Sequence, residues 1–98
     1  MTTILSGLNK LFDSRIRLGI MAVLSVNEQL DFNMLKELLQ ITDGNLASHL
    51  KALEKNELIC VQKQFVGRKP NTTYSTTLLG KEMFVQHLQA LEKLINLP

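Results

Sequence analysis

The chain has 98 residues, 45% of them hydrophobic, which leaves room for one hydrophobic core and no second domain. Its net charge of +2 is too small to indicate a nucleic-acid partner by itself, so only the positions of the charges can do so. No apolar run of about 18 residues could span a bilayer, and the N-terminus does not resemble a secretory signal. A single cysteine, Cys60, cannot form an internal disulfide, so we expect a cytoplasmic protein.

The N-terminal segment, residues 1–12, predicts a short leading helix. Apolar residues recur there at helical spacing: Ile4, Leu5, Leu8, Leu11 and Phe12. Asp13 and Ser14 have the chemistry of a fresh N-cap, so the main first helix is expected to begin after them and to end near Val26. Its buried face would hold Ile16, Ile20, Val23 and Leu24.

Two arginines, Arg15 and Arg17, fall in the first turn of this helix, where the helix dipole disfavours positive charge. A partner would explain them. DNA phosphate is the functional interpretation, whereas an ion pair with Asp13 or Asp31, or plain solvation, is the structural one. The polar residues 27–31 that follow have room for a very short strand.

Residues 32–56 predict a helix-turn-helix. Phe32, Leu35 and Leu39 recur on one helix face, and the pattern ends before Thr42. The Thr42 hydroxyl can accept a hydrogen bond from the backbone of Gly44 or Asn45 and so cap a second helix. We expect this second helix to end at Asn56, because asparagine tolerates the left-handed conformation. Its buried side would be made by Leu46, Leu50 and Leu53.

The side of the second helix opposite the leucines is small near its start and basic later. Small residues let a helix approach DNA closely, Asn and Ser can bond to base edges or phosphates, and lysines neutralise the backbone. Asp43 departs from this pattern; it could accept a hydrogen bond from a cytosine amino group, although stabilising the positive helix start is its commoner role. The exposed side would hold Gly44, Asn45, Ser48, Lys51 and Lys55.

Residues 58–76 predict a two-stranded wing. Along the first strand, Ile59, Val61, Lys63 and Phe65 would share the more apolar face, opposite Leu58, Cys60, Gln62 and Gln64. Residues 66–70 form the expected loop, and residues 71–76 favour a strand. Arg68 and Lys69 at the tip could contact a phosphate or the minor groove, although hairpin tips are also basic for solubility alone. No aromatic residue lies in the expected loop, so base stacking there is not expected.

Residues 78–96 predict a last helix, capped by Thr77. Gly80 in its first turn costs up to about 1 kcal/mol relative to alanine, which indicates a close approach by another segment. The apolar face of this helix is broader than a small core needs. We expect part of it to pack on a second copy of the chain, although the terminal segments could instead cover each other within one chain. The expected dimer interface comprises Ile4, Leu5, Leu8, Leu11, Phe12, Phe84, Leu88, Leu91 and Ile95.

No catalytic constellation can be assigned. His49 and His87 are the only histidines, and no Ser-His-Asp arrangement, phosphate-binding glycine loop or carboxylate cluster accompanies them. His49 lies at the edge of the leucine face and is more often bonded to a neighbour than to a phosphate. Cys60 without a nearby second ligand is weak evidence for a metal, so we predict no metal, no cofactor and no enzyme activity.

Three stretches resemble small, single-domain winged helix-turn-helix transcriptional regulators related to the MarR-like and ArsR-like families. They are Thr42-Asp-Gly-Asn-Leu-Ala-Ser-His-Leu-Lys-Ala-Leu-Glu-Lys-Asn-Glu-Leu-Ile59, Gly67-Arg-Lys-Pro-Asn-Thr-Thr-Tyr74 and Thr77-Leu-Leu-Gly80. The resemblance covers roughly Asp13 to Leu91. Members of that group are typically homodimeric DNA-binding repressors or activators, so the resemblance implies double-stranded DNA as partner and a dimer as active form.

Together these patterns predict a mainly helical winged helix-turn-helix domain over residues 1–98, which binds a pseudo-palindromic operator as a homodimer. Two alternatives remain open: a protein-interaction module without DNA binding, and a sensor for a small-molecule effector or metal. The candidate DNA-binding residues are Thr42, Asp43, Gly44, Asn45, Ser48, His49, Lys51, Lys55, Arg68, Lys69 and Asn71.

Overall fold

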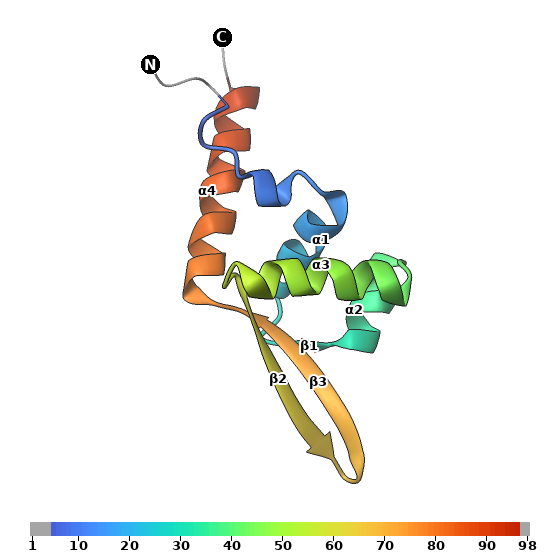
Figure 1. The fold of residues 1–98 in the computed structure, drawn as a ribbon. Coiled ribbons are helices and arrows are strands. Elements are labelled where there is room, and N and C mark those ends of the chain that lie inside the picture. Colours follow the sequence, from blue (N-terminus) through green and yellow to red (C-terminus); the bar gives the residue numbers. More distant parts are fainter. Residues whose placement is uncertain (1–4, 97–98) are drawn as a thin grey trace.

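The computed structural model describes residues 5–96 and confirms a mainly helical fold with a β-hairpin wing (Figure 1). The molecule measures 57 × 25 × 21 Å, with the wing and the last helix extending in opposite directions from the middle. Its elements in chain order are η1 (Lys10–Phe12), α1 (Arg15–Ser25), β1 (Leu30–Asp31), α2 (Phe32–Leu39), α3 (Asp43–Lys55), β2 (Ile59–Val66), β3 (Lys69–Thr76) and α4 (Leu78–Ile95).

Side-chain oxygens cap the four α-helices, as the sequence led us to expect for Thr42 and Thr77. Each capping residue has extended backbone, and its oxygen accepts a hydrogen bond from a backbone N–H three residues further on. This contact fixes where each helix begins. The capping pairs are Ser14–Arg17, Asp31–Met34, Thr42–Asn45 and Thr77–Gly80.

The core lies where α1, α2, α3, the base of the wing and the start of α4 meet. The three leucines expected on the inner side of α3 are buried, as are Ile20 and Leu24 of α1. Burial of these side chains stabilises the fold by roughly 1.5–3 kcal/mol each. The core cluster is made of Phe12, Ile20, Met21, Leu24, Leu30, Leu35, Leu46, Leu50, Leu53, Leu58, Ile59 and Phe84.

The expected leading helix is wrong over most of the described part of its length. Residues 5–8 form turns, and only Lys10–Phe12 form a single turn of 3-10 helix. Asn9 explains the change, because its side chain accepts a hydrogen bond from Leu11 N, at 2.9 Å, while its own N–H donates to Nδ1 of His87 at 3.1 Å. The first bond caps η1, so the helical turn begins only at Lys10, and the second ties the segment to α4. Ile4 lies outside the described residues.

The sheet has the antiparallel order β1-β3-β2. The short strand expected within residues 27–31 is present as β1, which pairs only with Tyr74 and Thr73 of β3. β2 and β3 pair along their whole length, from Ile59 with Thr76 to Val66 with Lys69. The outer half of the wing is therefore a two-stranded ribbon that projects away from the helices (Figure 1).

The end of α3 is fastened to the start of α4. Glu57, and not the expected Asn56, adopts the left-handed conformation, with φ of 62° against −91° for Asn56. Hydrogen bonds from Glu57 N to Glu54 O and from Leu58 N to Leu53 O complete a Schellman motif. Thr77 then bonds to both residues, through Oγ1 to Glu57 O at 2.7 Å and through its N–H to Leu58 O at 3.1 Å.

Candidate nucleic-acid interface

The turn between α2 and α3 sets the angle at which α3 is presented. Gln40 ends α2 in the left-handed conformation, with φ of 54°, and its N–H bonds to Lys36 O at 2.9 Å. Thr42 then caps α3 through a 3.2 Å hydrogen bond from Asn45 N to its hydroxyl. Because α3 buries its leucines against α1 and the sheet, its other side is directed outward.

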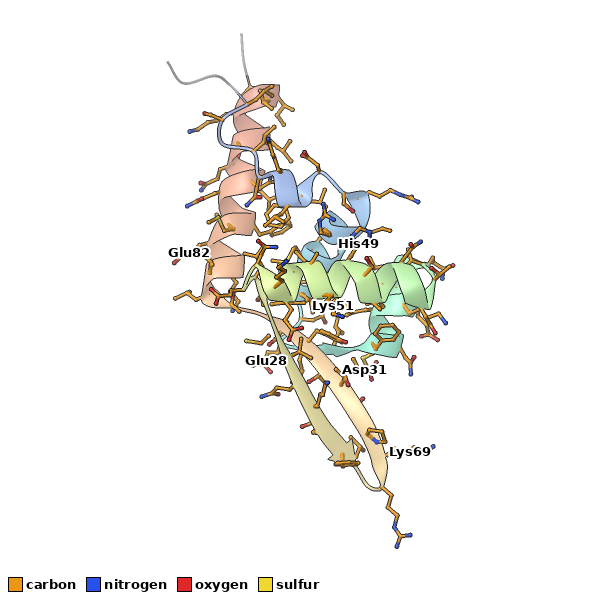
Figure 2. All side chains as sticks on the ribbon, viewed as in Figure 1. Glu28, Asp31, His49, Lys51, Lys69 and Glu82 are labelled. Atoms are coloured by element: carbon orange, nitrogen blue, oxygen red, sulfur yellow. The ribbon has the colours of Figure 1, made fainter. Side chains whose placement is uncertain are left out.

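The outward side of α3 carries the predicted recognition residues. Within residues 5–96, the side chains of Asn45, Ser48 and Lys51 form no hydrogen bond or ion pair. Their polar groups are therefore available to a ligand without breaking an internal contact. Figure 2 shows Lys51 on the side of α3 toward the wing. The exposed residues on this side are Gly44, Asn45, Ser48, Lys51 and Lys55.

Asp43 forms an ion pair that the sequence did not reveal. Its Oδ1 lies 2.8 Å from Nζ of Lys36, which links the last turn of α2 to the first turn of α3. Both side chains are well exposed, so the pair contributes no more than about 1 kcal/mol to stability. Asp43 also lies in the first turn of α3, as its expected helix-stabilising role requires. The pair compensates the one negative charge near the start of the recognition surface.

His49 is bonded to a neighbour, which was the structural interpretation of this residue. Its Nδ1 lies 3.1 Å from Nη1 of Arg17, and because arginine can only donate, Nδ1 accepts. Burial of the ring and then the positive charge of Arg17 lower the pKa of His49. Figure 2 shows His49 on the opposite side of α3 from Lys51, toward α1. The arrangement makes His49 a residue that positions α3.

Arg17 thus has a partner, although neither of the aspartates suggested by the sequence. Its Nε donates to the carbonyl oxygen of Leu11 and its Nη1 to His49. The side chain connects the end of η1, the start of α1 and the middle of α3. The unfavourable position in the first turn of α1 is offset by these two hydrogen bonds.

The wing ends in a tighter turn than the sequence indicated. The expected loop over residues 66–70 is reduced to Gly67 and Arg68, because Val66 and Lys69 already pair with each other. Gly67 has φ of 66°, which is the left-handed region expected at the first position of a type II′ turn. Arg68 and Lys69 are exposed, and Asn71 is half-buried. Figure 2 shows Lys69 near the outer end of the wing, away from the helices.

The expectation that no aromatic residue lies at the tip is wrong. Because the turn is short, Phe65 is only one pair removed from it, opposite Pro70, and is 74% exposed. The neighbouring Val66 is 62% exposed. The tip therefore combines apolar side chains with the positive charges of Arg68 and Lys69.

Tyr74, at the base of the wing, is half-buried and packs against the core cluster. Burial, and then the negative charge of Glu54 on α3, raise the pKa of the Tyr74 hydroxyl. Val61, opposite Tyr74, is half-buried, and Ile59 is buried in the core. The expected apolar face of β2 is thus confirmed at its inner end, where it anchors the wing beside the recognition helix.

The predicted dimer surface divides into two parts. Phe12 and Phe84 are buried within the chain, with ring centroids 5.9 Å apart in an edge-to-face contact, so the structure places them in the core of one chain. Gly7 crosses α4 so closely that an added Cβ would lie 3.0 Å from Ala90 Cβ. The two terminal segments do cover each other within one chain over this region. Leu8 and Leu11 are half-buried, whereas the residues left exposed are Leu5, Leu88, Leu91 and Ile95.

Other kinds of site find no support in the part of the chain described. Among residues 5–96, no three His, Cys, Asp or Glu side chains gather as metal ligands would. Cys60 is exposed. No described helix is long and apolar enough to cross a membrane.

Comparison with known proteins agrees with this geometry. A model of the winged helix DNA-binding domain matches residues 16–95. The chain belongs to the winged helix DNA-binding domain family. It is 35% identical, over 87% of its length and 92% of the relative's, to an uncharacterized protein of Methanocaldococcus jannaschii.

Two solved structures show the same winged helix fold. A transcriptional regulator homologue from Pyrococcus horikoshii OT3 is 32% identical, with a TM-score of 0.76 over 89% of this chain and 91% of that one. YusO from Bacillus subtilis is 18% identical, with a TM-score of 0.80 over 94% of this chain and 64% of that one, which supports the fold alone. The family and the Pyrococcus relative support a role in the regulation of transcription.

Proposed function

We propose that this winged helix protein is a sequence-specific regulator that binds double-stranded DNA as a homodimer on a pseudo-palindromic operator. The observation that carries the proposal is the exposed side of α3, whose polar and basic side chains have no internal partner within residues 5–96 and lie beside a basic wing. A helix of this kind fits the major groove, and the adjoining wing reaches the backbone or the minor groove.

Within this proposal, each part of the surface has its own task. Asn45 and Ser48 contact base edges in the major groove, where the absence of a side chain at Gly44 allows close approach. Lys51 neutralises backbone phosphates without reading sequence. The remaining backbone contacts come from Thr42, Lys55, Arg68, Lys69 and Asn71.

The dimer would use the exposed stripe of α4. Leu88, Leu91 and Ile95 follow a spacing of three and four residues, so they lie on one side of the helix, and that side is in line with the buried Phe84. An open apolar stripe at the end of a helix that extends beyond the core is a favourable surface for a second copy. A twofold dimer would place two recognition helices about 34 Å apart, on one face of the DNA.

The dimer is tested with Leu91→Glu, which introduces a charge into the stripe. Gln89→Glu is the matched control, because it adds the same charge to another exposed side of α4. In sedimentation velocity over a concentration series, the wild type and the control should form dimers and Leu91→Glu should stay monomeric.

The same variants then test the operator. Hydroxyl-radical footprinting of the wild type on a selected duplex should give two protected regions about 10 bp apart. Leu91→Glu should protect a single region at higher protein concentration. A monomeric wild type, or a dimer unaffected by Leu91→Glu, would contradict the proposed assembly.

A further inference from the structure

The outer end of the wing exposes apolar side chains that contribute little to the fold. Phe65 and Val66 are 74% and 62% exposed, and Pro70 lies opposite Phe65. β2 is an edge strand, and exposed apolar residues on an edge strand favour aggregation. Their presence at this position therefore needs a reason other than folding.

The face of the ribbon that carries Phe65 continues the face that packs on the core at the base of the wing, where Ile59 is buried and Tyr74 lies against the core cluster. Side chains alternate along a strand, so Phe65, Lys63 and Val61 share one face of β2, with Pro70, Thr72 and Tyr74 opposite them on β3. Tyr74 lies close enough to Glu54 of α3 for that carboxylate to affect its pKa. A ligand that lies along α3 and reaches the wing can contact this face.

The positive charges near Phe65 indicate which kind of ligand the tip of the wing can bind. Residues 58–76 contain Lys63, Arg68 and Lys69 and no acidic residue. All three cations are exposed, one on the same face as Phe65 and two at the turn. An apolar side chain surrounded by cations alone is complementary to a polyanion that offers an apolar interior, and duplex DNA offers one between its stacked bases.

The ribbon is long enough to bring its outer side chains to the mouth of a neighbouring groove. Four residue pairs, from Lys63–Thr72 to Val66–Lys69, extend beyond the part of β3 that pairs with β1. At about 3.4 Å per residue they span roughly 14 Å. The minor groove is about 7.5 Å deep and 6 Å wide, so it excludes the ribbon but admits a single side chain.

We propose that Phe65 is an apolar wedge that enters the minor groove beside the recognition site and partly unstacks one base step. The step would be a flexible pyrimidine–purine step, such as TA, because these steps unstack at the lowest cost. Arg68 and Lys69 hold the flanking phosphates. The wing then contributes to sequence preference through the deformability of DNA that α3 does not touch. This inference rests on the proposed function, in which α3 occupies the adjacent major groove.

The experiment uses two duplexes selected for binding that differ only in the flank reached by the wing, one with a TA step and one with a stiff A-tract. A 2-aminopurine base in the TA flank reports unstacking by an increase in fluorescence. The variants are Phe65→Ala, Phe65→Leu, which keeps an apolar wedge, and Gln64→Ala, an exposed control on the other face of β2.

Wild type, Phe65→Leu and Gln64→Ala should prefer the TA duplex and raise the 2-aminopurine fluorescence. Phe65→Ala should bind that duplex about tenfold more weakly, equivalent to roughly 1.4 kcal/mol, bind the A-tract duplex as the wild type does, and leave the fluorescence unchanged. Thermal unfolding of DNA-free Phe65→Ala should match the wild type, because the side chain is exposed.

Equal flank preference and fluorescence for Phe65→Ala and wild type would overturn the wedge while leaving the regulator proposal intact. The wedge would also be overturned if Phe65→Ala altered the sedimentation of DNA-free protein or its binding to anionic phosphatidylserine vesicles, since the tip would then be a protein or lipid contact. A wild type that binds no duplex selectively would instead defeat the proposed function.

Discussion

Gly80→Ala should be the most damaging small substitution in this chain. A Cβ at Gly80 would meet the carbonyl oxygen of Leu58 and lie 2.9 Å from its carbonyl carbon, and both are backbone atoms that cannot rotate away. The same carbonyl oxygen accepts the hydrogen bond from Thr77 N. The substitution therefore forces the start of α4 away from the end of α3 and breaks the junction that couples the two helices.

The magnitude follows from two opposing terms. Alanine gains at most about 1 kcal/mol over glycine in a helix, and the overlap with backbone costs more than that, so we expect a net loss of about 2–3 kcal/mol. For a domain of this size the melting temperature would fall by about 10–20 °C, as measured by circular dichroism at a fixed protein concentration.

Gly44→Ala is the control for this prediction, because no atom outside the adjoining residues and the backbone of α3 lies within 4 Å of the added Cβ in the described part of the chain. It should leave the melting temperature unchanged or raise it by a few degrees, although it adds a methyl group to the DNA-facing side of α3. A Gly80→Ala protein that melts within about 2 °C of wild type would refute the close approach of α4 to Leu58.

Three further predictions concern α3 and its ends. Glu57→Gly should stabilise the fold by about 1 kcal/mol in urea denaturation, because φ of 62° strains a non-glycine residue; a loss of stability would contradict the Schellman geometry. The folded state lowers the pKa of His49 below 6.5, so on acidification the unfolded chain takes up the proton of His49 before the folded chain does. The stability that neutral His49 contributes is therefore complete above pH 6.5 and is lost as the pH falls through the folded pKa. The difference in unfolding free energy between wild type and His49→Gln should therefore shrink on acidification, and a constant difference from pH 7.5 to about 5 would rule the linkage out. Lys51→Ala should weaken binding to all duplexes modestly and reduce the salt dependence, whereas Asn45→Ala should also change sequence preference; uniform loss on scrambled duplexes for both would contradict that division.

Sequence patterns predicted the features that depend on local chemistry. The cap at Thr42 depends on one hydroxyl and an N–H three residues away. The close approach at Gly80 was predicted because a glycine inside a helix needs a reason. For Thr42 the physical cause lies within one turn of the helix, whereas at Gly80 the glycine reveals that something approaches closely but not that the approaching backbone belongs to Leu58.

Features that depend on distant partners were not predicted. The apolar period of α4 shows that Phe84 is buried, but it cannot show whether Phe12 of the same chain or a second copy covers it. The Arg17–His49 hydrogen bond joins residues 32 positions apart, and no local pattern encodes such a contact. The ion pair between Lys36 and Asp43 likewise depends on the angle of the turn between two helices.

The tip of the wing shows how a small error in a turn changes a functional prediction. A five-residue loop and a two-residue turn are both compatible with Gly67 next to basic residues and a proline. Only the pairing of Val66 with Lys69 places Phe65 beside the tip. The strand pattern therefore included Phe65, but it placed Phe65 within the strand and away from the exposed tip.

We propose that the unpartnered side of α3 and the basic wing bind duplex DNA with sequence preference. A fluorescence-anisotropy titration of the full chain with selected and scrambled duplexes at two salt concentrations is the sharpest test of this binding. We expect tighter binding to the selected duplex and an affinity that falls steeply with salt, with a slope that counts the phosphates neutralised. Absence of binding at low salt, or an affinity that is indifferent to salt and sequence, would contradict it.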